Sequence, residues 1–260
     1  MIILALILAA IYSLALVFIT VYAVLEFHLL YCYLRSRRRI NALRPGPVAE
    51  WPRVTVQLPV FNELYVVERL IDDVCQLEYP LDKLEIQVLD DSTDETRDLV
   101  ARKCVHYSNL GIPIKHIHRT QRNGYKAGAL KEGLAVARGE FITIFDADFL
   151  PQPDFLKRCI PYFEDPAIGV VQTRWEHINE TYSLLTRLQA FQLNVHFTIE
   201  QSGRLAGGYF LQFNGTAGTW RRQAIEEAGG WHTDTLTEDL DLSFRAQLKG
   251  WKIHYLQDIG

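Results

Sequence analysis

Residues 2 to 25 contain no charged side chain, and this stretch constrains the fold more than any other feature of the chain. A bilayer core is crossed by roughly 20 helical residues, so the stretch is long enough to span it. A cleavable signal peptide would show a basic start, a shorter apolar core and a small-residue cleavage site, which this stretch lacks. A buried core helix is a weak alternative, because so long a segment has no polar face. We therefore expect a transmembrane helix over residues 1–34.

A basic cluster follows this helix directly, formed by Arg35, Arg37, Arg38 and Arg39. Segments rich in Lys and Arg stay on the cytoplasmic side of a membrane, so one N-terminal span with a cytoplasmic catalytic domain is expected. Residues 35–53 are predicted to be a basic juxtamembrane linker, because their second half is rich in Pro and Gly. The folded domain is then expected over residues 54–260.

The composition is that of a globular protein with one membrane segment, since 48% of the 260 residues are hydrophobic and 22% are charged. The net charge is −4 and no basic stripe is interleaved with aromatic residues, which argues against nucleic acid as a partner. The four cysteines are scattered, without a CxxC motif or a Cys/His cluster. Reduced and mostly buried thiols are therefore expected, in place of disulfides or a zinc site.

Strand-like apolar runs alternate with helical patterns from residue 54 onward. Strands are predicted over 54–60, 86–90, 114–118 and 141–145, with helices over 63–77, 92–105 and 127–138 between them. Ser92 and Glu95 are expected to form a capping box at the start of the second helix. This order predicts an α/β fold with an open, mostly parallel sheet and helices on both faces. Further on, a helix over 181–201 and another from residue 237 are expected, with strands near 169–175 and 251–256.

Polar side chains follow three of these strands at the point where each strand ends. They are Asn62 and Glu63, Asp90 and Asp91, and Asp146 and Asp148. Open α/β sheets bind ligands beyond the carboxyl ends of their strands. We therefore expect these side chains, which are distant in sequence, to converge on one crevice.

Two of these acidic pairs suggest specific ligands. Asp146 and Asp148 form an Asp-x-Asp motif, which alone is typical of an Asx-capped turn. Hard divalent cations, however, prefer carboxylate oxygen and keep substrate phosphates as further ligands. Helix capping does not explain Asp90 and Asp91 at the end of an apolar strand, and a carboxylate there could accept hydrogen bonds from a nucleobase or a ribose.

Two further residues are candidates for chemistry. Lys126 stands at a predicted helix start among small residues, where it could oppose phosphate charge together with the helix N-terminus. A solvated surface lysine is the alternative. In the acidic cluster of residues 237–241, Asp241 suits the dipole of a first helical turn. Asp239 could instead be a general base directed into the crevice.

Six segments, in this order and spacing, resemble the family 2 glycosyltransferases: PVFNE, LDDSTDE, NGYKAGAL, FDAD, FNGTAGTWR and TEDLDLSFR. Within that family they are most similar to membrane-embedded cellulose synthase-like and glucomannan synthase-like enzymes. The resemblance covers Val54 to about Leu256. It implies a GT-A fold, a nucleotide-diphosphate sugar donor and a Mg²⁺ or Mn²⁺ ion.

The resemblance also implies roles for individual residues. It makes Asp148 a metal ligand and Asp239 the base that deprotonates the acceptor hydroxyl. Asp146 would face both donor and metal. The residues implied on the donor side are Phe61, Asn62, Glu63, Asp90, Asp91, Lys126 and Asp146. Those implied on the acceptor side are Asn214, Gly215, Thr216 and Glu238.

The resulting hypothesis is inverting transfer of a hexose from GDP-mannose or UDP-glucose to a glycan acceptor, with formation of a β-glycosidic bond. The chain would act as part of a polysaccharide synthase. Processive members of the family carry a Gln-x-x-Arg-Trp motif downstream of Thr-Glu-Asp, whereas Gln172 to Trp175 here lie upstream with different spacing. We therefore expect a domain that is incomplete at its C-terminus.

Several alternatives stay open at this point. The chain could be a non-processive transferase to a lipid acceptor, or a non-catalytic fragment that binds a nucleotide sugar. A nucleotidylyltransferase would need a Gly-rich, Arg-containing loop after the first strand, which PVFNE does not offer.

Two patterns that contain histidine are expected to have a structural role and not to bind a metal. His116 and His118 share a strand face and could bind a metal, but histidines on an exposed edge strand are more often structural or solvated. His196 and Glu200 lie one helical turn apart and are expected to pack or to pair on the helix surface.

Overall fold

The computed structural model describes residues 2–40, 45–46 and 48–259; the side chains of residues 37–40 are not among those described. Residues 41–44 and 47, which belong to the predicted linker, lie outside this range. Contacts divide the chain into two compact units. One combines Met1–Leu43 with His177–Tyr209, and the other combines Arg44–Glu176 with Phe210–Gly260. The segment 177–209, predicted to be part of the 54–260 domain, thus groups with the N-terminal helix.

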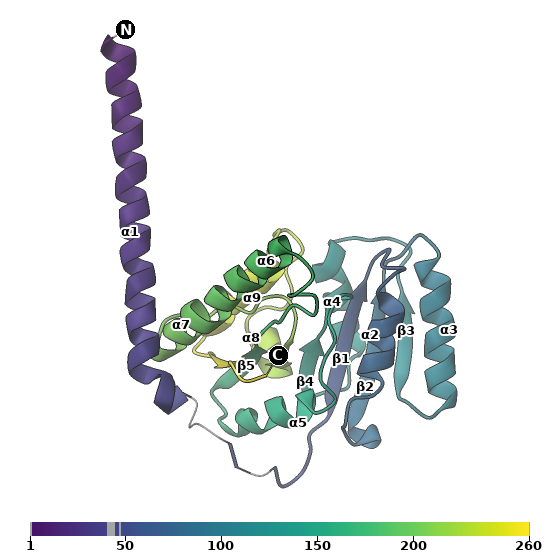
Figure 1. The fold of residues 1–260 in the computed structure, drawn as a ribbon. Coiled ribbons are helices and arrows are strands. Elements are labelled where there is room, and N and C mark those ends of the chain that lie inside the picture. Colours follow the sequence, from purple (N-terminus) through teal and green to yellow (C-terminus); the bar gives the residue numbers. More distant parts are fainter. Residues whose placement is uncertain (1, 41–44, 47, 260) are drawn as a thin grey trace. The chain divides into compact units, whose positions relative to one another are not determined.

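The first unit is built on α1 (Ile2–Ile40), which continues past residue 34 into the predicted linker (Figure 1). Among the described residues, Ile2–Ser36 forms a helix long and apolar enough to cross a membrane. Its partner is a continuous helical segment. That segment consists of α6 (Leu184–Val195), the π-helix η3 (His196–Gln201) and α7 (Ser202–Gly207).

Side-chain chemistry sets the start of α6 and the packing of α7. Ser183 and Thr186 form a capping box, in which the Ser183 hydroxyl accepts a bond from the Thr186 amide at 3.1 Å. At Gly203, an added Cβ would lie 2.5 Å from the carbonyl oxygen of Leu29, so glycine permits the close contact between α7 and α1. His196 and Glu200 form the predicted pair, with 2.7 Å between Nδ1 and Oε2.

The second unit contains a seven-stranded sheet in the order β3-β2-β1-β4-β6-β5-β7. Its strands are β1 (Val54–Val60), β2 (Leu84–Asp90), β3 (Ile114–His118), β4 (Phe141–Ile144), β5 (Ile168–Thr173), β6 (Gly218–Arg221) and β7 (Lys252–Leu256). The helices are α2 (Val67–Val74), α3 (Thr96–Asn109), α4 (Tyr125–Val136), α5 (Phe155–Cys159), α8 (Arg222–Glu227) and α9 (Glu238–Leu248), with short 3₁₀ turns η1 (Leu81–Lys83) and η2 (Ile160–Glu164). β6 runs antiparallel to both of its neighbours, and the other pairings are parallel, which confirms the mostly parallel sheet.

Helices cover both faces of the sheet, as the apolar strands predicted. Val56 and Leu58 of β1 are fully buried in a core shared with α2, α3 and α5. On the opposite face, Gly133 of α4 lies so close that an added Cβ would meet the Gln57 amide at 2.6 Å. Because successive side chains of a strand alternate between faces, β1 packs on helices from both sides.

Two helices, α2 and α3, begin about one turn later than predicted. The helix after β1 begins at Val67 and not at Glu63, because residues 63–66 form a turn in which the Glu63 carbonyl accepts from Val66 and Val67. The next helix begins at Thr96, whose amide donates to Asp94 Oδ1 at 3.0 Å. The expected Ser92–Glu95 capping box does not form between these described residues, since the Ser92 hydroxyl accepts from the Asn62 amide instead.

The four cysteines all lie in the described part of the chain, and none is paired with another. Cys104 and Cys159 are buried, whereas Cys32 and Cys75 are half-buried. Burial raises the pKa of Cys75 and of Cys104 to about 12, so these thiols stay protonated at neutral pH.

Because the side chains of β1 are buried, truncating one of them should lower the free energy of unfolding. Leu58 is fully buried, so Leu58→Ala should lower the free energy of unfolding by about 2–5 kcal/mol. Leu248 at the end of α9 is 75% exposed, so Leu248→Ala should stay within about 0.5 kcal/mol of wild type. Denaturant unfolding in detergent would measure both changes, and equal effects would contradict this packing.

Candidate active site

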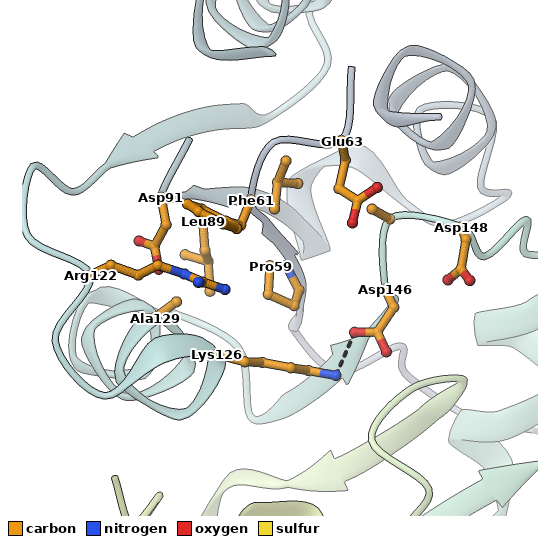
Figure 2. A pocket seen from close by; sticks show the side chains of 12 residues that line it. Pro59, Phe61, Glu63, Leu89, Asp91, Arg122, Lys126, Ala129, Asp146 and Asp148 are labelled. Carbon is orange, nitrogen blue, oxygen red and sulfur yellow. Dashed lines mark ion pairs between the residues drawn. The ribbon is translucent and has the colours of Figure 1, made fainter. Parts of the chain in front are cut away.

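A pocket of about 320 Å³ opens where β1, β2 and β4 end (Figure 2). It is lined by Pro59, Val60, Phe61, Glu63, Leu89, Asp91, Arg122, Lys126, Ala129, Asp146, Ala147 and Asp148. Four of the six side chains predicted to converge at this edge of the sheet do line the pocket, and Asn62 and Asp90 do not. Of the predicted donor and metal residues, those that line the pocket are Phe61, Glu63, Asp91, Lys126, Asp146 and Asp148.

One side of the pocket is anionic, and Figure 2 shows Glu63, Asp146 and Asp148 gathered there. Lys126 reaches this group from α4, with 2.5 Å between its Nζ and Asp146 Oδ1. Burial raises the pKa of Glu63, and the charges of Asp148 and Asp146 raise it further. The pKa of Asp146 is raised by burial and by Asp148, although Lys126 opposes the shift. This side of the pocket therefore carries more negative charge than Lys126 balances.

Two acids of α9 add to this charge. Glu238 and Asp239 occupy the first turn of the helix, as the sequence predicted. Burial raises the pKa of Glu238; Lys126 opposes this shift, and the charges of Asp239 and Asp146 add to it. The Asp239 charge also raises the pKa of Asp146. The electrostatic coupling indicates that the acids of α9 and of the Asp-x-Asp motif face a common space.

The loop between Asn214 and Thr216 lies between these two acidic groups. β6 is antiparallel to β4, so Gly218 at its start pairs with Ile144 at the end of β4. The Thr216 hydroxyl accepts from the Asp146 amide at 2.8 Å. At Gly215, which has φ +80°, an added Cβ would lie 3.2 Å from Asp239 Oδ2 and 3.4 Å from Lys126 Nζ. Glycine is needed there for both its backbone conformation and its small size.

Buried polar side chains that the sequence analysis did not identify hold this loop. The Gln172 side chain in β5 accepts from the Asn214 amide at 2.9 Å and donates to the Thr216 carbonyl at 3.1 Å. Ser243 of α9 accepts from the Phe213 amide at 2.9 Å and donates to the Asp239 carbonyl at 2.6 Å. The loop and the helix that carries Asp239 are thereby tied together.

The other side of the pocket is cationic and aromatic. Asp91 is bound by the buried guanidinium of Arg119, with 2.6 Å between Arg119 Nε and Asp91 Oδ1. Arg122 lies over the Phe61 ring, 3.5 Å from its centroid, and also lines the pocket. A cation over an aromatic face is a stabilising arrangement. Neither arginine was identified from sequence, although HRTQRNGYK places both just before Lys126.

Asn62 ties the ends of β1 and β2 together and does not line the pocket. It has a left-handed backbone, with φ +56°, which asparagine tolerates better than most residues. Its amide donates to the Ser92 hydroxyl at 2.9 Å, and its Oδ1 accepts from the Thr93 amide at 2.9 Å. Asn62 therefore positions its neighbours Phe61 and Glu63, which do line the pocket.

Asp90, predicted as a donor-binding residue, lies outside the pocket lining. Its side chain is fully buried and accepts from the Ser92 amide at 2.8 Å and from His116 at 2.7 Å. Burial opposes ionisation, but the hydrogen bonds from His116 and Ser92 outweigh it and lower the pKa of Asp90. Asp90, His116 and His118 each offer a ligand atom, and these atoms lie within 4.8 Å of one another. The alternation of side chains along β2 explains why Asp90 and Asp91 have different surroundings.

The anionic side of the pocket fits a hard divalent cation. Its donors are carboxylate oxygens, which Mg²⁺ and Mn²⁺ prefer. Asp146 Oδ1 is engaged by Lys126, so Asp148, Glu63 and the second oxygen of Asp146 are the donors that would hold the ion. Burial is the main cause of the raised pKa values of Glu63 and Asp146, and the neighbouring acids add to it; a bound cation would offset both effects.

Comparison with known proteins identifies the family of this chain. Residues 52–259 match the family model described as glycosyltransferase like family 2. The chain belongs to glycosyltransferase family 2. It is 50% identical to glucomannan 4-beta-mannosyltransferase 2 of Arabidopsis thaliana, an alignment that covers 81% of this chain and 40% of the relative. It is 48% identical to glucomannan 4-beta-mannosyltransferase 9 of the same plant, over 79% of this chain and 40% of the relative.

The glycosyltransferase chain spans about two fifths of the length of these relatives. Among solved structures it is similar to the mannosyltransferase PcManGT from Pyrobaculum calidifontis, determined in complex with GDP-Man and Mn²⁺. The TM-score is 0.68 at 27% identity, over 91% of this chain and 64% of that chain. The α/β unit therefore has the expected GT-A fold, and the family resemblance seen in the sequence is confirmed.

The raised carboxyl pKa values predict how Mn²⁺ stabilises the fold at different pH. An acid whose pKa is higher in the folded than in the unfolded state destabilises the fold when it is ionised. This destabilisation is absent at a pH below the ordinary pKa of the acid, and it grows as the pH rises through the raised pKa of the folded state. Mn²⁺ would bind the cluster in its ionised form, so the stabilisation by Mn²⁺ should be greatest near about pH 7 and fade toward about pH 4. Thermal unfolding in detergent should show a gain of about 2.7 kcal/mol at about 100 times the Kd of Mn²⁺.

The control for this prediction is Asp148→Asn, which removes one charge and one proposed ligand. Its melting temperature should respond less to Mn²⁺ near neutral pH than that of the wild type. A pH-independent gain, or an undiminished gain in Asp148→Asn, would contradict the proposed cation site.

Proposed function

We propose that this chain carries the membrane-anchored catalytic unit of a GDP-mannose-dependent, inverting β-mannosyltransferase that extends a glycan. The names of its relatives support mannosyl transfer to glucomannan. The GDP-Man and Mn²⁺ in the PcManGT complex support GDP-mannose over UDP-glucose as the donor.

The observation that carries the proposal is the convergence of five carboxylates around Lys126. They come from the end of β1, the end of β4 and the first turn of α9, and they are Glu63, Asp146, Asp148, Glu238 and Asp239. Lys126 pairs with Asp146, but burial and the neighbouring acids still raise the pKa values of Glu63, Asp146 and Glu238, a pattern that is common at functional sites. A diphosphate-bound divalent cation supplies the positive charge that such a site needs.

Each side of the pocket would bind a different part of the nucleotide-sugar donor. The side formed by Phe61, Asp91 and Arg122 offers an aromatic face, a carboxylate acceptor and a guanidinium, which suit a nucleoside. Lys126, on the anionic side, would bind the diphosphate as a point charge. Asp146 and Asp148 would hold the divalent cation, which when bound neutralises charge on the departing diphosphate.

Asp239 is the proposed general base. It would take the proton from the acceptor hydroxyl, whose oxygen then attacks the anomeric carbon on the face opposite the diphosphate and inverts its configuration. The bond from the anomeric carbon to the diphosphate oxygen breaks as the β-glycosidic bond forms. Asn214, Gly215, Thr216 and Glu238 would bind the acceptor; an added Cβ at Gly215 would lie 3.2 Å from Asp239 Oδ2, and Glu238 precedes Asp239 in the chain.

Two substitutions separate the base from the metal ligand. Asp239→Asn keeps the size of the side chain but cannot accept the proton, so kcat should fall by roughly 10²–10⁴-fold while GDP-mannose still binds. Asp148→Asn should weaken both Mn²⁺ and GDP-mannose binding by at least roughly tenfold. Donor binding by calorimetry and transfer from radiolabelled GDP-mannose would measure both.

Full turnover by Asp239→Asn would refute its assignment as the base. If the unsubstituted chain binds GDP-mannose without transfer or hydrolysis, the alternative of a non-catalytic nucleotide-sugar-binding unit would replace the proposal. A labelled product extracted with lipid would favour the lipid-acceptor alternative over a glycan.

We also propose that α1 spans the membrane and that the GT-A unit faces the cytoplasm. The apolar helix Ile2–Ser36 and the arginines that follow Leu34 support this orientation. Ser108 lies exposed at the end of α3, so Ser108→Cys should react with a membrane-impermeant maleimide only after cells are permeabilised. The unsubstituted chain provides the background, and labelling in intact cells would reverse the orientation.

A further inference from the structure

The ends of β2 and β3 carry a cluster of side chains that the proposed transfer reaction does not use. Asp90 and His118 are direct partners in the parallel register of β2 and β3, and His116 pairs with Val88 two residues earlier. The two histidines lie on the same face of the edge strand β3, since side chains two apart share a face. A carboxylate and two imidazoles thereby meet, although 26 residues separate Asp90 from His116.

The distances within this cluster are close to those of a coordination sphere. His116 Nε2 lies 2.7 Å from Asp90 Oδ2, and His118 Nδ1 lies 3.6 Å from the same oxygen. One ligand atom from each of the three residues falls within 4.8 Å of the others. Metal–ligand bonds of about 2.0–2.1 Å in a tetrahedral site place ligand atoms about 3.3 Å apart. Small side-chain rotations would therefore accommodate an ion.

The surroundings favour a bound ion as well. The Asp90 carboxylate is 0% exposed, and its other oxygen, Oδ1, accepts from the Ser92 amide, which fixes its orientation. The imidazoles of His116 and His118 are 18% and 24% exposed, so an ion and a water ligand can enter from the open side of β3. His118 Nδ1 also lies 3.0 Å from the Asp90 carbonyl oxygen, a hydrogen bond that the ion would replace.

We propose that Asp90, His116 and His118 form a second metal site, selective for Zn²⁺ or a similar nitrogen-preferring cation. Two imidazoles and one carboxylate suit zinc, whereas the all-carboxylate cluster at Asp146 and Asp148 suits Mg²⁺ or Mn²⁺. Both histidines would bind the ion as neutral rings. The proton that His116 Nε2 donates to the Asp90 carboxylate would move to Nδ1, and the proton that His118 Nδ1 donates to the Asp90 carbonyl would move to Nε2.

The site lies next to the pocket without belonging to it. Asp91, the next residue in the chain, lines the pocket, and Ser92 bonds both Asp90 and the Asn62 amide. A bound ion would therefore fix the ends of β2 and β3 beside the pocket. This inference rests on the cluster alone and does not depend on the proposed transferase activity.

Metal content tests the site directly. The chain, purified in detergent and stripped with a chelator, is equilibrated with Zn²⁺, desalted and analysed for zinc. The zinc content of the double variant His116→Gln/His118→Gln should be lower than that of the wild type by one zinc ion per chain. Any zinc bound by the carboxylates at Asp146 and Asp148 is present in both proteins, so it does not affect the difference in zinc content between them. His106→Gln, at an exposed histidine of α3, is the matched control and should retain the wild-type amount.

Zinc K-edge X-ray absorption of the wild type gives an independent measurement that needs no variant. The spectrum should contain scattering from two imidazole rings, and it decides the matter if the double variant fails to fold by circular dichroism. Equal zinc content in the wild type and a folded double variant, or a wild-type spectrum without imidazole scattering, would overturn the proposal. The cluster would then be a hydrogen-bonded network only.

Discussion

The repulsion among carboxylates at one edge of the sheet is the constraint on which the site depends. Glu63, Asp146 and Asp148 approach one another in the pocket, and Glu238 and Asp239 of α9 add their charge. Lys126 contacts Asp146 and the Gly215 carbonyl, but its single charge does not compensate all five acids. Burial raises the pKa values of Glu63, Asp146 and Glu238, and the charges of neighbouring acids raise them further. A fold that tolerates such repulsion must be held together by other interactions.

Neutral hydrogen bonds supply much of that support. Gln172 is buried in β5 and holds the backbone of Asn214 and Thr216, while Ser243 links α9 to Phe213. The Thr216 hydroxyl in turn accepts from the Asp146 amide. These bonds join the acidic strand end and the acidic helix through one loop. The acids can therefore stay close although the Lys126–Asp146 ion pair neutralises only part of their charge, and the remaining charge is available for a ligand.

The central sheet and the grouping of site residues could be predicted from sequence because both follow from local pattern. Apolar strands alternating with helices define a parallel sheet, and residues after such strands lie at one edge. The start of α3 could not be predicted, because Ser92 had two competing uses. Its hydroxyl accepts from Asn62, and this contact between loops is invisible in the order of residues. Arg119 and Arg122 were missed because nothing local indicates which of several basic residues turns inward.

By itself, the sequence determined the long apolar N-terminal helix, the GT-A unit and its family. It also determined six residues of the pocket, which are Phe61, Glu63, Asp91, Lys126, Asp146 and Asp148. The reason is that periodicity and motif spacing are properties of short segments. Only the tertiary structure decided that Asp90 turns away from Asp91 to meet His116 and His118, and that residues 177–209 group with α1. Strand register and helix packing join residues that are distant along the chain, so they depend on which surfaces bury one another and not on local pattern.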